Sequence, residues 1–367
     1  MKTVSVVHLV PSFGCGGLER VIANVIAGNS SPHINHTVIS LSSDTSFSHA
    51  LPSGTNCISV HKRPGKDLGA HLRVAKVLRQ VEADVLHTYN FATMEYHPIA
   101  KLVGVKIGIH ADHGMGGDDK GGKGRVKLLF RKLVSYFLHH YVVVNDALKL
   151  WAINDIGVPA SKVVHIPNGV PIPEMEPLRH RLPKELRIVS IGRLAPVKNH
   201  AALLGAIDDL QQRYACGEVN FQVHCQIVGD GPLRHQLETR AAELPAPDNV
   251  SFEGEQADVL PFIHGADFLV LSSDYEAMPM VMLEALAASR PVVAPNVGGM
   301  AAFSRWPAVY LSKDNQPSSL VSTIIQAATK SYAEQAESCE EARRMIVDQF
   351  SLTRMSMRYH ELYSRQK

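Results

Sequence analysis

The sequence predicts an α/β protein built from two doubly wound domains, each with a parallel sheet covered by helices on both faces. Short β-rich runs alternate with helical patterns over almost the whole chain, and one proline-rich stretch interrupts this alternation. The length of 367 residues corresponds to about two domains of roughly 150 residues each.

The first part of the chain contains the first set of alternating patterns. Its apolar runs predict strands at 4–10, 36–41, 57–61, 84–87, 106–110 and 141–144. Helical periodicity predicts helices at 17–27, 70–81, 92–103, 126–139 and 146–155.

The proline-rich stretch separates the two domains. Residues 167–183 contain five prolines in seventeen positions, and each lacks the N–H group that a strand or helix interior requires. We therefore expect an N-terminal domain at 1–166, a linker at 167–184 and a C-terminal domain at 185–349. A terminal helix at 350–367 is expected to pack back on the N-terminal domain.

The second part resumes the same alternation. Strands are expected at 186–191, 221–228, 250–252, 268–271 and 292–294. Helices are expected at 201–214, 233–242 and 280–288, with two or three amphipathic helices after residue 318.

The charge is distributed unevenly although the net charge is only +2. Residues 1–166 carry 18 Lys and Arg against 11 Asp and Glu, a net charge of +7, and 13 of the 19 His; residues 167–367 carry −5. A hydrophobic content of 45% excludes a disordered chain, and no apolar run reaches the roughly 20 residues of a membrane span. The start shows no secretory leader pattern, and the five Cys show no metal spacing. We expect a cytoplasmic protein with reduced thiols.

The motif with the most chemistry follows the predicted strand at 268–271. Glu276 lies in a polar loop, and a helix is expected to begin after Pro279, where unpaired N–H groups form an anion site. Glu284 lies on that helix, eight residues after Glu276, and Gly298 and Gly299 follow the next strand. Two carboxylates flanking an anion site predict a ligand with hydroxyl groups on both sides of its phosphates; solvated surface glutamates are the alternative.

A second strand-to-helix loop carries cations. Arg193 and Lys198 follow Gly192, which permits a close approach of the backbone to a ligand. Their charges and strand-end position predict binding of a diphosphate.

Glycines mark two further loops. Gly229 belongs to a tight turn after the strand at 221–228, where a ligand-lining and a purely structural role are equally compatible with the sequence. Gly16 and Gly17 open the first helix without the spacing of a dinucleotide site, which excludes nicotinamide and flavin but permits close contact with an anion or sugar.

Histidines follow two strands of the first domain. His113 lies in a glycine-rich loop after the strand at 106–110 and is a candidate cleft residue, as is His87, whereas His110 is expected to point into the sheet. No cluster has metal-ligand spacing, so no metal cofactor is expected.

A basic stretch precedes and enters the predicted helix at 126–139. It favours contact with an anionic membrane surface or a solvated helix face, while nucleic acid is disfavoured because no recognition motif accompanies the charge. Its six cations are Lys120, Lys123, Arg125, Lys127, Arg131 and Lys132.

These motifs resemble the retaining glycosyltransferases of family four, which have the GT-B fold of two Rossmann-like domains facing a cleft. The resemblance lies in the segments SDYEAMPMVMLEALAASRPVVAPNVGG, GRLAPVKN, VGDGPLR, IPNGV and GGLE. The segments GGLER, HKRPGKDLG, VLHTYN and DHG further resemble the bacterial branch associated with exopolysaccharide export.

The resemblance implies transfer of a sugar from a nucleotide-diphosphate sugar, with uracil as the expected base. The acceptor would be a saccharide or lipid-linked glycan of bacterial exopolysaccharide, capsule or lipopolysaccharide synthesis. It implies that Arg193 and Lys198 bind the diphosphate, that Glu276 contacts the transferred sugar with the backbone near Met280 and Val281, and that Glu284 accepts from the ribose. Gly16 and Gly17 would close over the phosphates, and His113 would lie beside the reacting sugar. The configuration of the sugar would be retained.

Three positions depart from the family pattern, namely Ala277 and Ser289, where glycine is usual, and Tyr89, where histidine is frequent. They affect the expected sugar and acceptor contacts without removing an expected catalytic group. Two alternatives stay open at this point, a sugar-nucleotide epimerase of the same fold and a catalytically silent sugar-nucleotide binder.

Overall fold

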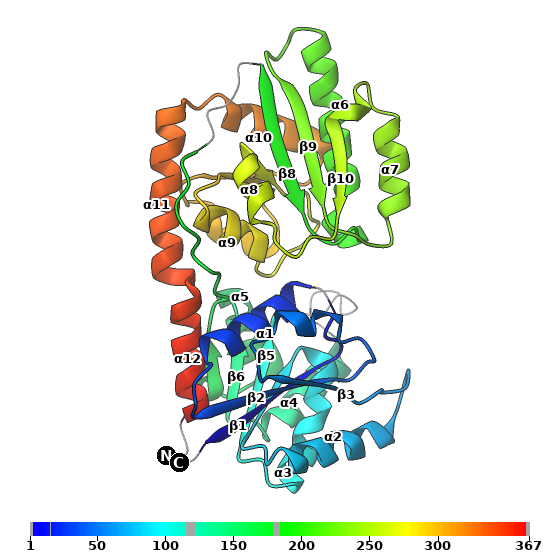
Figure 1. Cartoon of the computed structure of the whole chain (residues 1–367), viewed down its shortest axis with the longest axis vertical. Helices are drawn as coiled ribbons and strands as arrows, with labels where there is room; N and C mark the ends of the chain where they lie inside the picture. The colour runs from blue at the N-terminus through cyan, green and yellow to red at the C-terminus, as the bar shows by residue number, and fades with distance from the viewer. Residues whose placement is uncertain (1–2, 15, 115–121, 123, 179–183, 365–367) are drawn as a thin grey trace. The chain divides into compact units, whose positions relative to one another are not determined.

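The computed structural model describes residues 3–14, 16–114, 122, 124–178 and 184–364, which form two compact units (Figure 1). Unit 1 combines Met1–Gly169 with Leu352–Lys367, and unit 2 comprises Val170–Ser351. Each unit contains a parallel sheet with helices on both faces, which confirms the predicted fold class.

The described part of unit 1 contains a seven-stranded sheet in the order β3-β2-β1-β4-β5-β6-β7, with all neighbouring strands parallel. The order reverses between β1 and β4, and ligands of such sheets bind at the carboxyl ends of the strands near that reversal. The strands are β1 (Val4–Val10), β2 (Ile34–Ser40), β3 (Asn56–Ser59), β4 (Val85–Tyr89), β5 (Ile107–Asp112), β6 (His140–Val143) and β7 (Val163–His165).

Helices cover both faces of this sheet. One face packs on α2 and α3 through Val74, Leu78 and Ala100, and α12, which also contacts α1, covers the other face. The helices are α1 (Gly17–Gly28), η1 (Ser46–Ala50), α2 (Leu68–Gln80), η2 (Phe91–Tyr96), α3 (His97–Leu102), α4 (Arg125–Ser135), α5 (Asp146–Trp151), η4 (Ala152–Ile156), η5 (Ala160–Lys162) and α12 (Leu352–Ser364).

Several predicted elements of unit 1 differ from the structure at their ends. The predicted helix at 92–103 is a 3-10 helix, η2, followed by α3, because Pro98 can only occupy the first turn of a new helix. Helix α4 ends at Ser135 rather than at residue 139. Strand β7 was not predicted, since three residues carry too little periodicity.

The described part of unit 2 contains a six-stranded parallel sheet in the order β10-β9-β8-β11-β12-β13, which reverses between β8 and β11. Strand β13 was not predicted. The strands are β8 (Glu185–Ile191), β9 (Gln222–Val228), β10 (Val250–Gly254), β11 (Phe268–Val270), β12 (Val292–Pro295) and β13 (Val309–Ser312).

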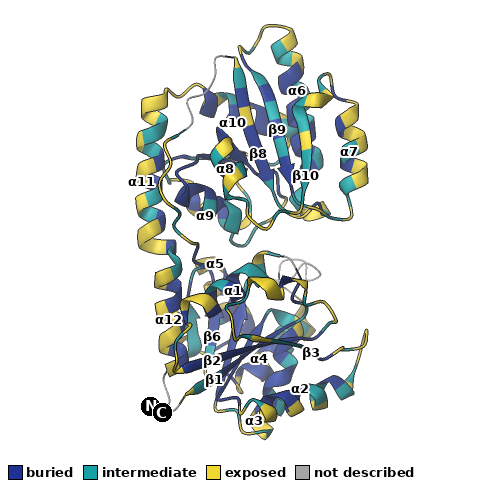
Figure 2. Ribbon diagram, in the orientation of Figure 1, coloured by how far each residue is buried: buried dark blue, intermediate teal, exposed yellow. Residues whose placement is uncertain are grey.

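Two apolar clusters fill the space between this sheet and its helices. One contains residues of α6, α7 and α10, and the other contains residues of α8, α9 and α11. The strands are therefore largely buried, while α7 and α11 expose their outer faces (Figure 2). The helices are α6 (His200–Ala215), α7 (Arg234–Ala242), α8 (Leu260–Gly265), α9 (Met280–Ala287), α10 (Pro317–Ala328) and α11 (Tyr332–Phe350), with η6 (Pro196–Lys198), η7 (Pro247–Asn249) and η8 (Gly298–Phe303).

The proline-rich stretch packs on unit 2 over most of its described length. The Pro173 carbonyl accepts a hydrogen bond from Arg343 at 2.6 Å, and the Pro177 carbonyl accepts one from Arg290 at 3.1 Å. Ile172 also packs against the core of unit 2. The chain changes unit between Gly169 and Val170, within the predicted linker, and again between Ser351 and Leu352. Residues 179–183 lie outside the described residues.

Many histidines of unit 1 are core residues and not surface charges. His8 bonds to Tyr89 at 2.8 Å and to His36 at 3.0 Å, and His87 bonds to Tyr363 of α12 at 3.0 Å. Burial lowers the pKa of His8 and His87 well below the usual value and that of His36 to about 4. These rings are neutral at pH 7, so they contribute nothing to the positive charge of this unit.

Candidate active site

The loops after β8 and β11 meet at a lysine and a glutamate. The Lys198 ammonium donates to Oε1 of Glu276, which also accepts from the Ser273 hydroxyl at 2.8 Å. The Ser272 hydroxyl donates to the Lys198 carbonyl at 3.0 Å, which ties the two loops together. The Lys198 and Glu276 side chains keep 25% and 12% of their surface exposed. A single ligand can therefore contact a cation and a carboxylate at adjoining points.

Two glycines after β12 hold the glutamate loop. The Gly299 N–H donates to the Glu276 carbonyl at 2.6 Å. A Cβ at Gly298 would lie 2.3 Å from that carbonyl oxygen, and one at Gly299 would lie 1.9 Å from the Ala277 carbonyl oxygen. Gly298 also has a φ of 53°, which favours glycine. The backbone of the glycine pair therefore contacts the backbone of the Glu276 loop directly.

Gly229 brings the turn after β9 against the loop after β8. Its φ is 139°, and a Cβ there would lie 2.1 Å from the Gly192 carbonyl oxygen. The Leu194 N–H donates to the Asp230 carbonyl at 2.9 Å and continues this contact. Close packing of two loops explains the glycine, and a ligand contact at Gly229 remains a prediction.

Arg193 projects from the loop that these contacts fix. It is exposed, and none of the hydrogen bonds or ion pairs among the described residues holds its guanidinium. Arg193 does not contact the Lys198–Glu276 pair, but both Arg193 and Lys198 follow the carboxyl end of β8. The guanidinium is therefore accessible to an anion.

Helix α9 presents its first turn beyond the glutamate loop. The N–H groups at its start lack partners within the helix, and the positive end of the helix dipole lies there. Met280 and Val281 form this turn and are half-buried against the core of unit 2, and Glu284 is half-buried one turn later. The positions predicted from the sequence thus lie around the carboxyl edge of β8 and β11.

In unit 1, His113 directly follows β5. Its N–H donates to the Asn90 side-chain oxygen at 3.0 Å, and its ring has a hydrogen bond with the Asn168 side chain. Burial lowers the pKa of His113 to about 4, although the nearby Asp112 carboxylate acts in the opposite direction. The ring is neutral at pH 7 and is held in place from two loops.

A buried ion pair beside His113 was not predicted from the sequence. Arg131 Nη1 donates to both carboxylate oxygens of Asp112, at 2.9 and 3.1 Å, and the Tyr141 hydroxyl donates to the same carboxylate. Both members of the pair are at most 1% exposed. Burial alone would raise the pKa of Asp112, but Arg131 and His110 hold it below its usual value, so the carboxylate is ionised.

Aromatic rings complete the surroundings of this pair. The Arg131 guanidinium carbon lies 4.8 Å from the ring centres of both Phe91 and Trp151. The charge pattern of the sequence predicts Arg131 as one of six cations of a basic surface stretch, and for Arg131 this prediction is wrong. It occupies the inner side of α4, with Val134 and Ser135. Lys120 and Lys123 of that stretch lie outside the described residues.

The glycines before α1 lie at another strand end of unit 1. Gly16 is the N-cap of α1 with extended backbone, and Gly17 is the exposed first residue of the helix. A Cβ at Gly16 would lie 2.4 Å from Oε2 of Glu19, whose pKa is raised by burial. The acidic side chain therefore lies directly over this backbone.

His87 is not a cleft residue. It is fully buried, and its Nδ1 lies 3.0 Å from the hydroxyls of both Tyr89 and Tyr363. Tyr89 is buried in the same cluster. His110 is buried in the sheet as expected and bonds to Thr88 at 2.8 Å.

Two family models match consecutive parts of the chain. Residues 15–173 match Glycosyltransferase Family 4, and residues 176–345 match the glycosyl transferases group 1. The chain therefore consists of consecutive domains of these two glycosyltransferase families. Among relatives of this glycosyltransferase is UDP-Gal:alpha-D-GlcNAc-diphosphoundecaprenol alpha-1,3-galactosyltransferase of Escherichia coli, which is 25% identical over 64% of the chain. The match spans 63% of that relative, less than two thirds of its length.

Solved structures support the fold of this glycosyltransferase over nearly its whole length. A glycosyltransferase from Rickettsia africae superposes with a TM-score of 0.78 at 18% identity, covering 99% of this chain and 98% of the other. Anabaena HepE in complex with UDP and glucose gives 0.79 at 19% identity, covering 98% and 99%. None of these comparisons favours the epimerase alternative. Among the described residues, the helices are too short or too polar to span a bilayer.

Proposed function

We propose that this glycosyltransferase moves a sugar from a UDP-sugar to a saccharide or lipid-linked acceptor in bacterial glycan synthesis, with retention of configuration at the anomeric carbon. The name of the Escherichia coli relative, which specifies a UDP-Gal donor, and the UDP bound to the Anabaena protein support the choice of uracil. The family resemblance supports retention.

The contact between Lys198 and Glu276 carries this proposal. In a nucleotide sugar, the anionic diphosphate lies next to the sugar and its hydroxyl groups. The Lys198 cation and the Glu276 carboxylate lie next to each other in a corresponding arrangement. Lys198 and Arg193 bind the diphosphate, and Glu276 accepts hydrogen bonds from the sugar hydroxyls. The diphosphate gains charge as the glycosidic bond breaks, so cations placed there stabilise the transition state more than the bound substrate.

The remaining predicted residues complete the donor site. The first turn of α9, at Met280 and Val281, presents N–H groups to the donor, and Glu284 accepts from the ribose hydroxyls. The turn at Gly229 lines the nucleotide. The two cations and the helix terminus together supply positive charge for the leaving group, so the proposed reaction requires no metal.

Unit 1 contributes the acceptor side of the proposed reaction. His113 contacts the reacting sugar as a neutral ring, fixed by Asn90 and Asn168. The backbone of Gly16 and Gly17 contacts the donor phosphates. A β-carbon at Gly16 would require the Glu19 side chain to move.

Release of nucleotide from donor sugars tests the proposal. UDP-, GDP- and ADP-sugars are incubated with the full chain and with candidate acceptors, and free nucleotide and intact sugar nucleotide are measured. We expect UDP release that increases with an acceptor. Lys198→Ala should lower turnover at least about 100-fold, the effect of removing one transition-state charge donor. The control, Lys330→Ala, changes an exposed lysine beyond α10 and should have wild-type turnover. Binding without turnover would contradict catalysis and favour a silent binder.

We also propose that α4 places unit 1 on an anionic membrane surface. Val126, Leu129 and Leu133 follow one another along the helix with 82%, 58% and 55% of their surface exposed. Arg125 and Lys132 are exposed on the same helix. An exposed apolar stripe flanked by cations is the pattern of an interfacial helix.

A further inference from the structure

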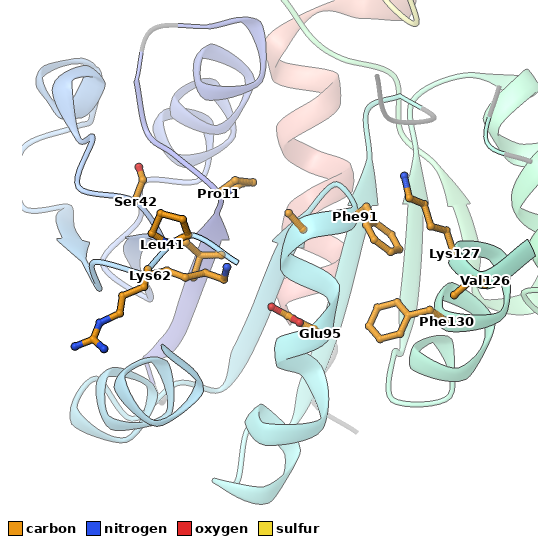
Figure 3. A pocket seen from close by; sticks show the side chains of 12 residues that line it. Pro11, Leu41, Ser42, Lys62, Phe91, Glu95, Val126, Lys127 and Phe130 are labelled. Atoms are coloured by element: carbon orange, nitrogen blue, oxygen red, sulfur yellow. The ribbon is translucent and has the colours of Figure 1, made fainter. Parts of the chain in front are cut away.

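A pocket of about 720 Å³ in unit 1 combines apolar and charged walls. It lies at the carboxyl edge of the sheet, where Pro11 follows β1, Leu41 follows β2 and Phe91 follows β4. Figure 3 shows Leu41 and Lys62 on one side and Lys127 and Phe130 of α4 on the other. The position at the end of the central strands is the usual one for a ligand of a doubly wound sheet.

The walls of this pocket are apolar over a large area. Phe91 and Phe130 pack edge to face with their ring centres 5.5 Å apart. Leu41 and Pro11 face them in the pocket, and Val126 at the rim is 82% exposed. Apolar walls that remain open to solvent favour a ligand with a hydrocarbon part.

Three cations line the same pocket. Lys127 Nζ lies 5.7 Å from the ring centre of Phe91, and Lys62 Nζ donates to the Gly65 carbonyl at 2.8 Å. Arg63 is exposed beside them, whereas Glu95 is the one acidic side chain among the described lining residues. Three cations against one acid favour an anionic ligand.

We infer that this pocket binds the acceptor of the proposed reaction through a phosphate group attached to a hydrocarbon chain. The inference rests on the proposed function, because it identifies the acceptor class of that reaction. The phosphate contacts Lys62, Arg63 and Lys127, and the hydrocarbon lies against Phe91 and Phe130. A neutral saccharide would leave both the cations and the apolar walls without a matching group.

Binding of farnesyl phosphate to the full chain, measured by calorimetry below its micelle concentration and without any donor, tests this inference. Farnesol and inorganic phosphate are the matched probes. We expect farnesyl phosphate to bind at least about tenfold more tightly than either, since it alone matches both kinds of wall. Equal binding of farnesol would overturn the role of the phosphate, and equal binding of inorganic phosphate would overturn the role of the apolar walls.

Two pairs of variants locate the site. Lys127→Glu should weaken farnesyl phosphate binding at least about tenfold; the new carboxylate suits the first turn of α4, so folding is retained. Its control is Arg79→Glu, at an exposed cation of α2 outside the pocket. Val126→Gln should weaken binding by about threefold, and Leu129→Gln, on the same helix but outside the pocket, should not. Equal losses of farnesyl phosphate affinity in a variant and its control would show that the ligand binds nonspecifically to the protein surface, and would overturn the inference.

UDP binding to the same variants separates this inference from the proposed function. The pocket residues belong to unit 1, and the proposed diphosphate ligands Arg193 and Lys198 belong to unit 2. We expect Lys127→Glu to retain wild-type UDP affinity while losing farnesyl phosphate. Wild-type UDP binding without farnesyl phosphate binding would overturn this inference alone, and failure of the wild-type chain to bind UDP would overturn the proposed function.

Discussion

Each unit joins a cation to a carboxylate at the carboxyl edge of its sheet, but in opposite environments. In unit 2 the Lys198–Glu276 pair is partly exposed, and the side chains are held by a few loop contacts. In unit 1 the Arg131–Asp112 pair is at most 1% exposed and is enclosed by Tyr141, Phe91 and Trp151. The difference separates a pair that a ligand can reach from a pair that only supports its neighbours.

The environments determine what each pair contributes. A partly exposed pair adds little to the free energy of unfolding, since both charges are also solvated when apart. Removal of one member of a buried pair leaves an uncompensated charge and is strongly destabilising. We therefore expect unit 2 to use its pair for binding and unit 1 to use its pair to hold β5 and the adjacent His113.

The largest expected effect is on stability in unit 1. Arg131→Met should lower the free energy of unfolding by about 3–5 kcal/mol, because Asp112 stays buried without its cation. Urea unfolding measures this loss. Lys132→Met, at the exposed neighbouring position, is the control and should change the value by less than about 0.5 kcal/mol. A loss below about 1 kcal/mol in Arg131→Met would show that the buried pair does not support the unit.

The converse effect is expected in unit 2. Arg193→Ala should lower turnover at least about 100-fold, because the accessible guanidinium is proposed to bind the departing diphosphate. Its unfolding midpoint should match that of the wild-type chain, since the side chain is exposed. Steady-state nucleotide release measures the first effect and thermal unfolding the second. Wild-type turnover would remove Arg193 from the donor site.

The dependence of stability on pH also distinguishes the two units, because their numbers of buried histidines differ. Among the described residues, five buried histidines lie in unit 1 and one, His200, lies in unit 2. Above pH 6.5 such rings are neutral in both native and unfolded chains. Below it the unfolded rings bind protons, whereas the native pKa of His36 is about 4 and those of His8 and His87 are also lowered.

Stability should therefore fall as the pH decreases from about 6.5 to about 4, by roughly 1.4 kcal/mol per pH unit for each such ring. Unit 1 should lose its structure first. Urea unfolding at pH 7.5, 6 and 5 measures the decline in the free energy of unfolding. His36→Gln should reduce the slope of this decline by the contribution of one ring, roughly 1.4 kcal/mol per pH unit. Equal stability at pH 7.5 and 5 would contradict neutral burial of these histidines.

The smallest expected effect concerns α4. Vesicles containing anionic lipid should bind the chain about tenfold more strongly than neutral vesicles at low salt, and 0.5 M salt should abolish the difference. Leu133→Gln should weaken this binding by removing part of the exposed stripe. Sedimentation with vesicles measures it. Equal binding to neutral vesicles would remove the electrostatic contribution.

The residues of the proposed donor site could be brought together from the sequence because each part of that site is local. Glu276, Pro279 and Glu284 lie within one loop and helix, and the strand end explains why Arg193 and Lys198 share an edge. The fold class followed from alternation, since buried parallel strands are short continuous apolar runs.

The supports of His113 could not be predicted in the same way. Asn90, Arg131 and Asn168 come from three separate segments, and only the fold brings them beside β5. Arg131 is surrounded by Lys and Arg in the sequence, so charge patterning predicts a surface cation. Its burial depends on the Asp112 carboxylate and on two aromatic rings, which no local pattern reveals.

Calorimetric titration of the chain with UDP tests most directly whether the partly exposed Lys198–Glu276 pair of unit 2 is a ligand site. Lys198→Ala should weaken UDP binding at least about tenfold, while Lys330→Ala and Lys132→Met keep the wild-type affinity. The unfolding midpoint of Lys198→Ala should change little, since its pair is partly exposed. Wild-type UDP affinity in a folded Lys198→Ala chain would contradict the assignment of this pair to the donor.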